Sequence, residues 1–173
     1  MASDTYDTYL STLVAAAEAL EARGLEVRFV CSNTRMDPPV AEQIAARMNG
    51  GSRISIADVR NVDDFVNAVL DAQLVIASRL HAVILSLLAG TAVVAIAPAR
   101  KVTQQMLDFG FERYCVEMQG LRPAALLAAV DGALARRRDI RRSIDLRLGE
   151  LRKNLNASFE QLAAVVPGRG REG

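Results

Sequence analysis

The sequence predicts a three-layer α/β domain, built on a five-stranded parallel sheet in the strand order 2-1-3-4-5 and followed by a long C-terminal helix. First, short segments rich in β-forming residues alternate with helical segments of about ten residues, which is typical of strand–helix–strand units around a parallel sheet. Second, residues 74–77 and 92–97 are continuously apolar, as strands covered by helices on both faces are. Third, a chain of 173 residues, 51% apolar and 24% charged with a net charge of +1, has the composition of one soluble globular domain. Right-handed crossovers leave few alternatives to this strand order.

The first predicted element is a helix that begins after Ser3 or Asp4 and ends before Gly24. Its apolar residues recur at helical spacing. They are Tyr6, Leu10, Leu13, Val14, Ala17 and Leu20.

A strand over residues 26–31 comes next, and a polar turn over residues 32–39 leads from it into a second helix. In this turn Asp37 can cap the helix, and Pro38 or Pro39 can begin it.

The remaining elements continue the alternation. We expect further strands over residues 53–57, 74–77, 92–97 and 114–116. We expect helices over residues 38–48, 63–71, 79–89 and 101–109. Gly50 and Gly51 stop the first of these helices.

A long amphipathic helix is predicted over residues 138–166. Its apolar residues form a stripe of about seven turns. They are Ile140, Ile144, Leu148, Leu151, Leu155, Phe159, Leu162 and Val166. Such a helix either packs wholly on its own domain or packs in part on another domain or subunit. Residues 1–166 thus form a single domain, and residues 167–173 are expected to be a disordered tail.

The scarce residue types exclude several kinds of site. With one histidine, two cysteines and no tryptophan, the chain cannot build a histidine-rich metal cage, a zinc ribbon or a disulfide scaffold, and we expect no metal. Cys31 and Cys115 stand at the ends of apolar segments, so we expect reduced core thiols rather than a disulfide or a nucleophile. Any chemistry that needs an imidazole must use His81.

Several functional classes lack their motifs. The GxGxxG, GxxxxGK[ST] and GxSxG patterns of dinucleotide-binding proteins, P-loop NTPases and α/β-hydrolases are absent. Residues 122–153 hold nine basic and four acidic residues, but no aromatic residues are interleaved, so nucleic acid is not an expected partner. Neither a secretory signal nor a membrane-spanning run is present, and we expect a cytoplasmic protein that works in solution or at the inner face of the membrane.

In a parallel sheet of this order, ligands bind beyond the carboxyl ends of the first and third strands. The loops there begin at Ser32 and Ser78. Ser32 and Asn33 offer hydroxyl, amide and backbone groups, although such polar turns are common. His81 falls in the second loop, so the single histidine lies where the fold would place a site.

Arg79 is an unusual choice at this point of the chain. If Ser78 caps the next helix, Arg79, Leu80 and His81 occupy its first turn, where a cation opposes the helix dipole. A bound anion would remove the conflict, because free amides, a guanidinium and an imidazole together suit a phosphate or carboxylate. The alternatives are a salt bridge from Arg79 to Asp58 or Asp37 and a buried, hydrogen-bonded imidazole at His81.

A second candidate is the loop after the fourth strand. Arg100 and Lys101 stand at the start of a helix, again the wrong end for cations unless an anion binds there. Contact with a ligand and exposure to solvent are equally good interpretations of Lys101.

The stretch over residues 71–117 resembles the C-terminal part of the polysaccharide pyruvyl transferase family. The shared pattern is D-x-hydrophobic-R-x-H, a helix, a glycine turn, an apolar strand, a lysine-containing loop and L-G-hydrophobic. Its most specific piece here is R-L-H, then A-G and the lysine loop. The resemblance extends over residues 25–162.

Members of this family resemble GT-B glycosyltransferases, in which two Rossmann-like halves face each other across a cleft. They transfer pyruvyl from phosphoenolpyruvate to two sugar hydroxyls as a ketal, in surface or exopolysaccharide biosynthesis. The resemblance implies that Arg79, Leu80 and His81 form the phosphoenolpyruvate-binding motif, with His81 as general acid. The chain would be the Rossmann-like C-terminal half, and alone it would turn over little substrate because the N-terminal half is missing.

The expected site and partners follow from both arguments. His81 is the expected catalytic residue. The expected substrate-binding residues are Ser32, Asn33, Ser78, Arg79, Leu80 and Lys101. The expected ligands are phosphoenolpyruvate as donor and a sugar or lipid-linked saccharide as acceptor, and no cofactor is needed. The expected protein partners are the missing N-terminal domain or a partner subunit, and a second copy of the chain that binds through the C-terminal helix. Two other functions stay open: the nucleotide-sugar-binding half of a GT-B glycosyltransferase or epimerase, and a non-catalytic assembly module.

Overall fold

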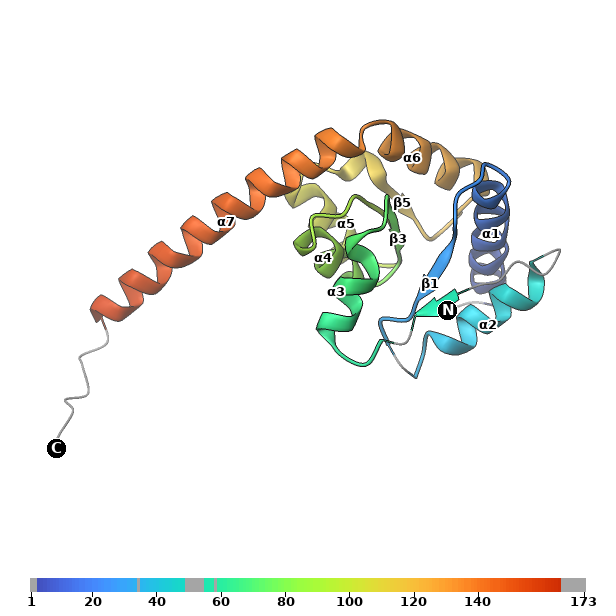
Figure 1. The fold of residues 1–173 in the computed structure, drawn as a ribbon, viewed down its shortest axis with the longest axis horizontal. Helices are drawn as coiled ribbons and strands as arrows, with labels where there is room; N and C mark the ends of the chain where they lie inside the picture. Colours follow the sequence, from blue (N-terminus) through green and yellow to red (C-terminus); the bar gives the residue numbers. More distant parts are fainter. Residues whose placement is uncertain (1–2, 34, 49–54, 58, 166–173) are drawn as a thin grey trace.

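The structure is a computed structural model that describes residues 3–33, 35–48, 55–57 and 59–165 (Figure 1). Its strands are short, parallel and arranged in two sheets. The smaller sheet pairs β1 (Arg28–Val30) with β2 (Ser55–Ala57). The larger sheet has β4 (Val93–Ala97) between β3 (Val75–Ala77) and β5 (Cys115–Glu117).

The prediction of one five-stranded sheet is therefore wrong, although the order within each part is as predicted. β2 lies beside β1, and β3, β4 and β5 follow in sequence. In the described part of the chain β1 and β3 are not paired, because both strands line a cleft that separates their edges.

Apart from α6, the described helices agree with the predicted ranges to within about two residues. They are α1 (Ser3–Glu21), α2 (Pro38–Arg47), α3 (Val62–Leu70), α4 (Leu80–Leu88), α5 (Arg100–Asp108), α6 (Pro123–Ala135) and α7 (Arg137–Val165). Helix α6 has no counterpart among the individually predicted elements. A 3-10 turn, η1 (Glu112–Tyr114), replaces the first residue of the strand predicted at 114–116.

The helices form two layers, one on each side of the strands (Figure 1). Helix α1 packs against α2 and α6, whereas α4 packs against α3 and α5. The larger sheet lies between these layers, and every residue of β4 is buried. A doubly wound α/β arrangement, as predicted, thus surrounds a core centred on β4.

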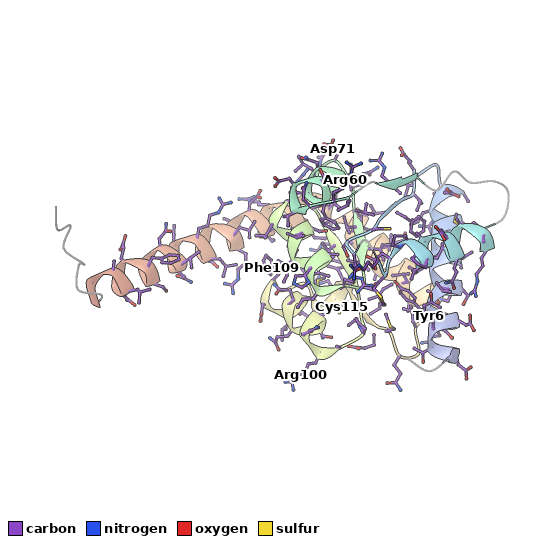
Figure 2. The ribbon with its side chains drawn as sticks, turned by 90° about the horizontal axis from the view of Figure 1, so that it is seen from below. Tyr6, Arg60, Asp71, Arg100, Phe109 and Cys115 are labelled. Atoms are coloured by element: carbon purple, nitrogen blue, oxygen red, sulfur yellow. The ribbon has the colours of Figure 1, made fainter. Side chains whose placement is uncertain are left out.

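Helix α7 leaves the body of the domain after its first three turns. Ile140 and Ile144 are buried in the core, and Leu148 is half-buried. From Leu151 onward the apolar stripe is exposed, and Phe159 is 60% accessible. Figures 1 and 2 show this outer half projecting away from all other elements. The interpretation that α7 packs wholly on its own domain is wrong.

Two further expectations concern the ends and the surroundings of the chain. The tail predicted over residues 167–173 lies outside the described residues. Among the helices that the structure describes, none combines the length and the apolarity needed to cross a membrane.

Candidate functional site

The loop after β1 and the start of α4 meet at the carboxyl ends of the strands, as the sequence predicts. Nε and Nη2 of Arg79 each lie 2.6 Å from Oδ1 of Asp37. The carboxylate is 19% exposed and the guanidinium 42% exposed. Of the alternatives for Arg79, the salt bridge to Asp37 is therefore present, and Asp58 lies outside the described residues.

Asp37 also organises the loop that precedes it. Its Oδ2 accepts hydrogen bonds from Ser32 Oγ at 3.1 Å and from the backbone N–H of Asn33 at 2.8 Å. The side-chain oxygen of Asn33 accepts from the backbone N–H groups of Arg35 and Met36 at 3.0 and 2.9 Å. One carboxylate thus holds both the loop and the arginine, and it makes the polar turn a fixed feature rather than an arbitrary connection.

Of the two predicted helix caps, Asp37 is right in position only, and Ser78 is wrong. Asp37 stands at the N-cap position of α2 but makes no capping hydrogen bond with its side chain, because its carboxylate is engaged by Arg79 and the loop. Ser78 is not the cap of α4; Arg79 occupies that position in an extended conformation. The Ser78 hydroxyl instead lies 2.9 Å from the hydroxyl of Tyr9 on α1.

The other predicted site residues take no part in the hydrogen bonds described for this cluster. His81 is the second residue of α4 and is exposed, so the interpretation as a buried imidazole is wrong. Leu80 is half-buried and packs against the main core. Lys101 is the second residue of α5 and is exposed; Arg100, rather than Lys101, begins that helix (Figure 2).

A cleft of about 1010 Å³ opens below the cluster, between the two sheets. Ser32, Asp37, Ser78 and Arg79 line it at the carboxyl ends of the strands, polar residues such as Glu26 and Gln73 line it before the strands begin, and apolar side chains line most of the rest. His81 does not belong to the described lining. The site therefore combines a polar mouth with an apolar interior.

Burial sets the protonation state of the nearby phenol and thiol. Desolvation raises the pKa of Tyr9, and the carboxylate of Asp37 raises it further, against the lowering effect of the Ser78 hydrogen bond. Desolvation and Asp37 likewise raise the pKa of the Cys31 thiol. Cys31 and Cys115 are both unpaired thiols, as predicted, and burial raises the pKa of Cys115 too. These groups stay neutral at physiological pH, and thiolate chemistry is disfavoured.

Tyr9 is the residue at this site that the sequence analysis did not select. It lies three residues after Tyr6 and four before Leu13, inside the apolar stripe of α1, so its spacing indicated a core position. Nothing in the local sequence connects it to Ser78, which lies 69 residues further along the chain.

Comparison with known families gives a clear result for this chain. A sequence model of the family described as "Polysaccharide pyruvyl transferase" matches residues 5–100, more than half of the chain. The chain belongs to the polysaccharide pyruvyl transferase family. Comparisons with curated proteins and with solved structures found no match.

The match places most of the site within the part shared by polysaccharide pyruvyl transferases. It extends from α1 to the first residue of α5, so it includes the Asp37 loop and the segment from Ser78 to His81. Lys101 lies one residue beyond it. The family thus bears on the Asp37–Arg79 cluster and on His81 more directly than on the lysine loop.

Proposed function

We propose that the chain is the donor-binding domain of a polysaccharide pyruvyl transferase, which transfers pyruvyl from phosphoenolpyruvate to two hydroxyls of a sugar as a ketal. The proposed acceptor is a sugar or lipid-linked saccharide in surface or exopolysaccharide biosynthesis. The observation that carries the proposal is the family match over residues 5–100, which includes the cluster around Arg79. The acceptor would bind mainly to a second, N-terminal half or to a partner subunit, facing this domain as in GT-B enzymes, so the domain alone would turn over little substrate.

The arginine can bind an anion without leaving Asp37. Among the described residues, both short contacts of Arg79 go to one carboxylate oxygen, and they leave Nη1 and the second proton of Nη2 for another acceptor. The first backbone N–H groups of α4 have no acceptor within the helix and point toward its N-terminal end. A guanidinium and helix amides together suit the carboxylate or the phosphate of phosphoenolpyruvate.

In the proposed reaction His81 supplies a proton to the methylene carbon of phosphoenolpyruvate. Protonation makes the neighbouring carbon electrophilic, and two hydroxyl oxygens of the acceptor bond to that carbon in turn while its bond to the phosphate oxygen breaks. The hydroxyls release two protons: one replaces the proton used on the methylene carbon, and the other leaves with inorganic phosphate. An imidazole can both donate and accept a proton, and the exposure of His81 at the start of α4 leaves it accessible to a ligand.

The single histidine makes donor binding easy to test, because the chain has one Hε1 resonance. Titration with about 1 mM phosphoenolpyruvate should shift that resonance in the wild type. Arg79→Ala should weaken binding by about tenfold or more, equivalent to ~1.4 kcal/mol. Arg100→Ala is the matched control, since it removes an exposed arginine at the start of the neighbouring helix.

Three outcomes distinguish the candidate functions. Equal affinity of wild type and Arg79→Ala for phosphoenolpyruvate would contradict the proposal. A larger shift with a UDP-sugar than with phosphoenolpyruvate would favour the nucleotide-sugar-binding alternative. Loss of binding in Arg79→Ala, with Arg100→Ala unchanged, would support a donor site at the start of α4.

The exposed half of α7 favours assembly as a second candidate role. Leu151, Leu155, Phe159 and Leu162 are between 41% and 60% exposed. The partner that fits is a second copy in antiparallel orientation, because residues 137–153 carry seven basic and three acidic residues, whereas residues 154–165 carry a single charge, a glutamate. Antiparallel pairing keeps the two basic segments apart. Sedimentation of wild type and Leu155→Lys tests it: a shared monomer mass would contradict this role.

A further inference from the structure

The cleft between the two sheets is bordered on each side by a strand. β1 and β3 line it along their whole lengths, together with the residues just before and after them. Side chains from α1, α2, α3 and α6 also line it. Its apolar lining includes Leu13, Leu20, Phe65, Val69, Val130 and Leu134.

The strand edges that border the cleft lack partners. Within the described residues β1 pairs with β2 alone and β3 pairs with β4 alone. Each strand therefore presents alternate N–H and C=O groups toward the cleft. Backbone groups left unpaired in a mainly apolar space cost free energy, so two such edges facing the same cleft form a template for another strand.

The topology gives the direction of that strand. Within each sheet the strands are parallel. The carboxyl ends of β1 and β3 lie at the same end of the cleft, because Asp37 joins Ser32, which follows β1, to Arg79, which follows β3. The spatial order is therefore β2, β1, the cleft, β3, β4, β5. A parallel strand in the cleft would complete a six-stranded doubly wound sheet, in which order reverses at the inserted strand. Helix α1, which packs beside α2, would then occupy the layer of a crossover helix leading into β1.

We infer that the cleft receives one extended, mainly apolar polypeptide segment from outside these 173 residues, running parallel to β1 and β3 and hydrogen-bonded to both. The segment must be apolar on both faces, because helices cover the cleft on both sides. Its carboxyl end would lie beside Ser32 and Ser78, at the mouth that holds Asp37 and Arg79. The inference does not depend on the proposed chemistry, but it means that the polar site lacks one wall until the strand is in place.

A peptide tests the inference on the purified chain. The probe is a peptide of about ten residues with a central Val-Val-Ile-Val run and lysines at both ends for solubility. We expect binding with a dissociation constant on the order of 10 µM. Hydrogen exchange should slow at least about tenfold for inward-facing amides of both β1 and β3 when the peptide is present.

Two matched controls separate strand pairing from apolar adhesion. A peptide with prolines at alternate central positions keeps its apolar character but loses the N–H groups that pair, so it should bind at least about tenfold more weakly. Ala68→Phe places a ring in the cleft from α3 and should weaken binding, whereas Ala128→Phe, on the exposed surface of α6, should not. If Ala68→Phe fails to fold, the comparison of the two peptides still decides the question.

Several results would overturn the inference. They are equal affinity of the two peptides, protection of one strand edge without the other, and slow exchange at both edges before any peptide is added. The last result would mean that β1 and β3 pair directly in solution. Displacement of the peptide by a second copy of the chain, seen as a dimer in sedimentation, would also overturn it.

Discussion

Replacing Asp37 should uncouple the loop after β1 from the start of α4. In Asp37→Ala the chain loses both contacts with Arg79, together with the hydrogen bonds from Ser32 and the backbone of Asn33. Because Arg79 is 42% exposed, it can be rehydrated, and its ion pair contributes only about 0.5–1 kcal/mol. The two loop hydrogen bonds add about 1 kcal/mol each. We therefore expect a destabilisation of about 2.5–3 kcal/mol.

Thermal unfolding measures this effect directly. For a chain of this size, 1 kcal/mol shifts Tm by about 2–4 °C, so Asp37→Ala should unfold about 5–12 °C below wild type. Asp139→Ala, which removes an exposed carboxylate from the first turn of α7, should change stability by less than about 0.5 kcal/mol. If the two variants unfold at the same temperature, the Asp37 cluster does not stabilise the fold as argued.

The charge of Asp37 should also oppose an anionic ligand. Asp37→Asn keeps an acceptor oxygen and removes one negative charge beside Arg79. At about 4 Å and partial exposure this charge is worth about 1 kcal/mol, so phosphoenolpyruvate should bind about fivefold more tightly. Calorimetric titration of wild type and variant measures the change. If Asp37→Asn instead weakens phosphoenolpyruvate binding as much as Arg79→Ala does, this electrostatic reasoning is wrong, and Asp37 is needed to hold Arg79 in place.

Other parts of the structure give sharp contrasts in stability. On α7, Ile144→Ala should lower the free energy of unfolding in urea by about 2–4 kcal/mol, because the side chain is fully buried. Leu155→Ala should lower it by less than about 0.5 kcal/mol in dilute monomer, because that side chain is exposed. Equal losses would mean that α7 packs differently. Removing a buried hydroxyl should change stability in opposite directions at two sites. Thr91→Val loses a 3.0 Å hydrogen bond to a backbone carbonyl, so it should lower the free energy of unfolding by about 1–2 kcal/mol. Ser86→Ala removes an Oγ with no partner among the described residues, so it should raise Tm. Because the pKa of Tyr9 is raised in the folded chain, the unfolded chain loses the phenol proton first as pH rises. The free energy of unfolding should therefore fall above about pH 10, and it should fall less steeply in Tyr9→Phe. Parallel pH profiles of the two proteins would contradict this prediction.

The elements of the fold were predictable where the local pattern was strong. Continuous apolar runs identified β3 and β4, and the four-and-three spacing identified α7 to within one residue at each end. The split between β1 and β3 was not predictable, because pairing depends on contacts between segments that local periodicity does not report. Helix α6 was missed because Ala and Leu recur along it without a clear polar face.

The candidate site shows the same division. Strand-end topology brought Ser32, Asn33, Ser78 and Arg79 to one place, and the charge conflict at Arg79 led to Asp37 as one of its two expected partners. Asp37 stands at the predicted cap position but makes no side-chain capping bond, because its carboxylate has several competing donors and only the folded geometry decides between them. Whether these residues and His81 act on phosphoenolpyruvate stays a prediction.

The outer half of α7 has a thermodynamic character unlike the rest of the domain. Beyond Leu151 every described side chain is exposed, so helicity there rests on local terms alone, such as the hydrogen bond from Ser158 Oγ to the Asn154 carbonyl. About 15 residues without tertiary packing are near the limit at which a helix persists in water. This arm therefore unwinds and rewinds independently of the core, and whatever binds its apolar stripe must supply the free energy of keeping it helical.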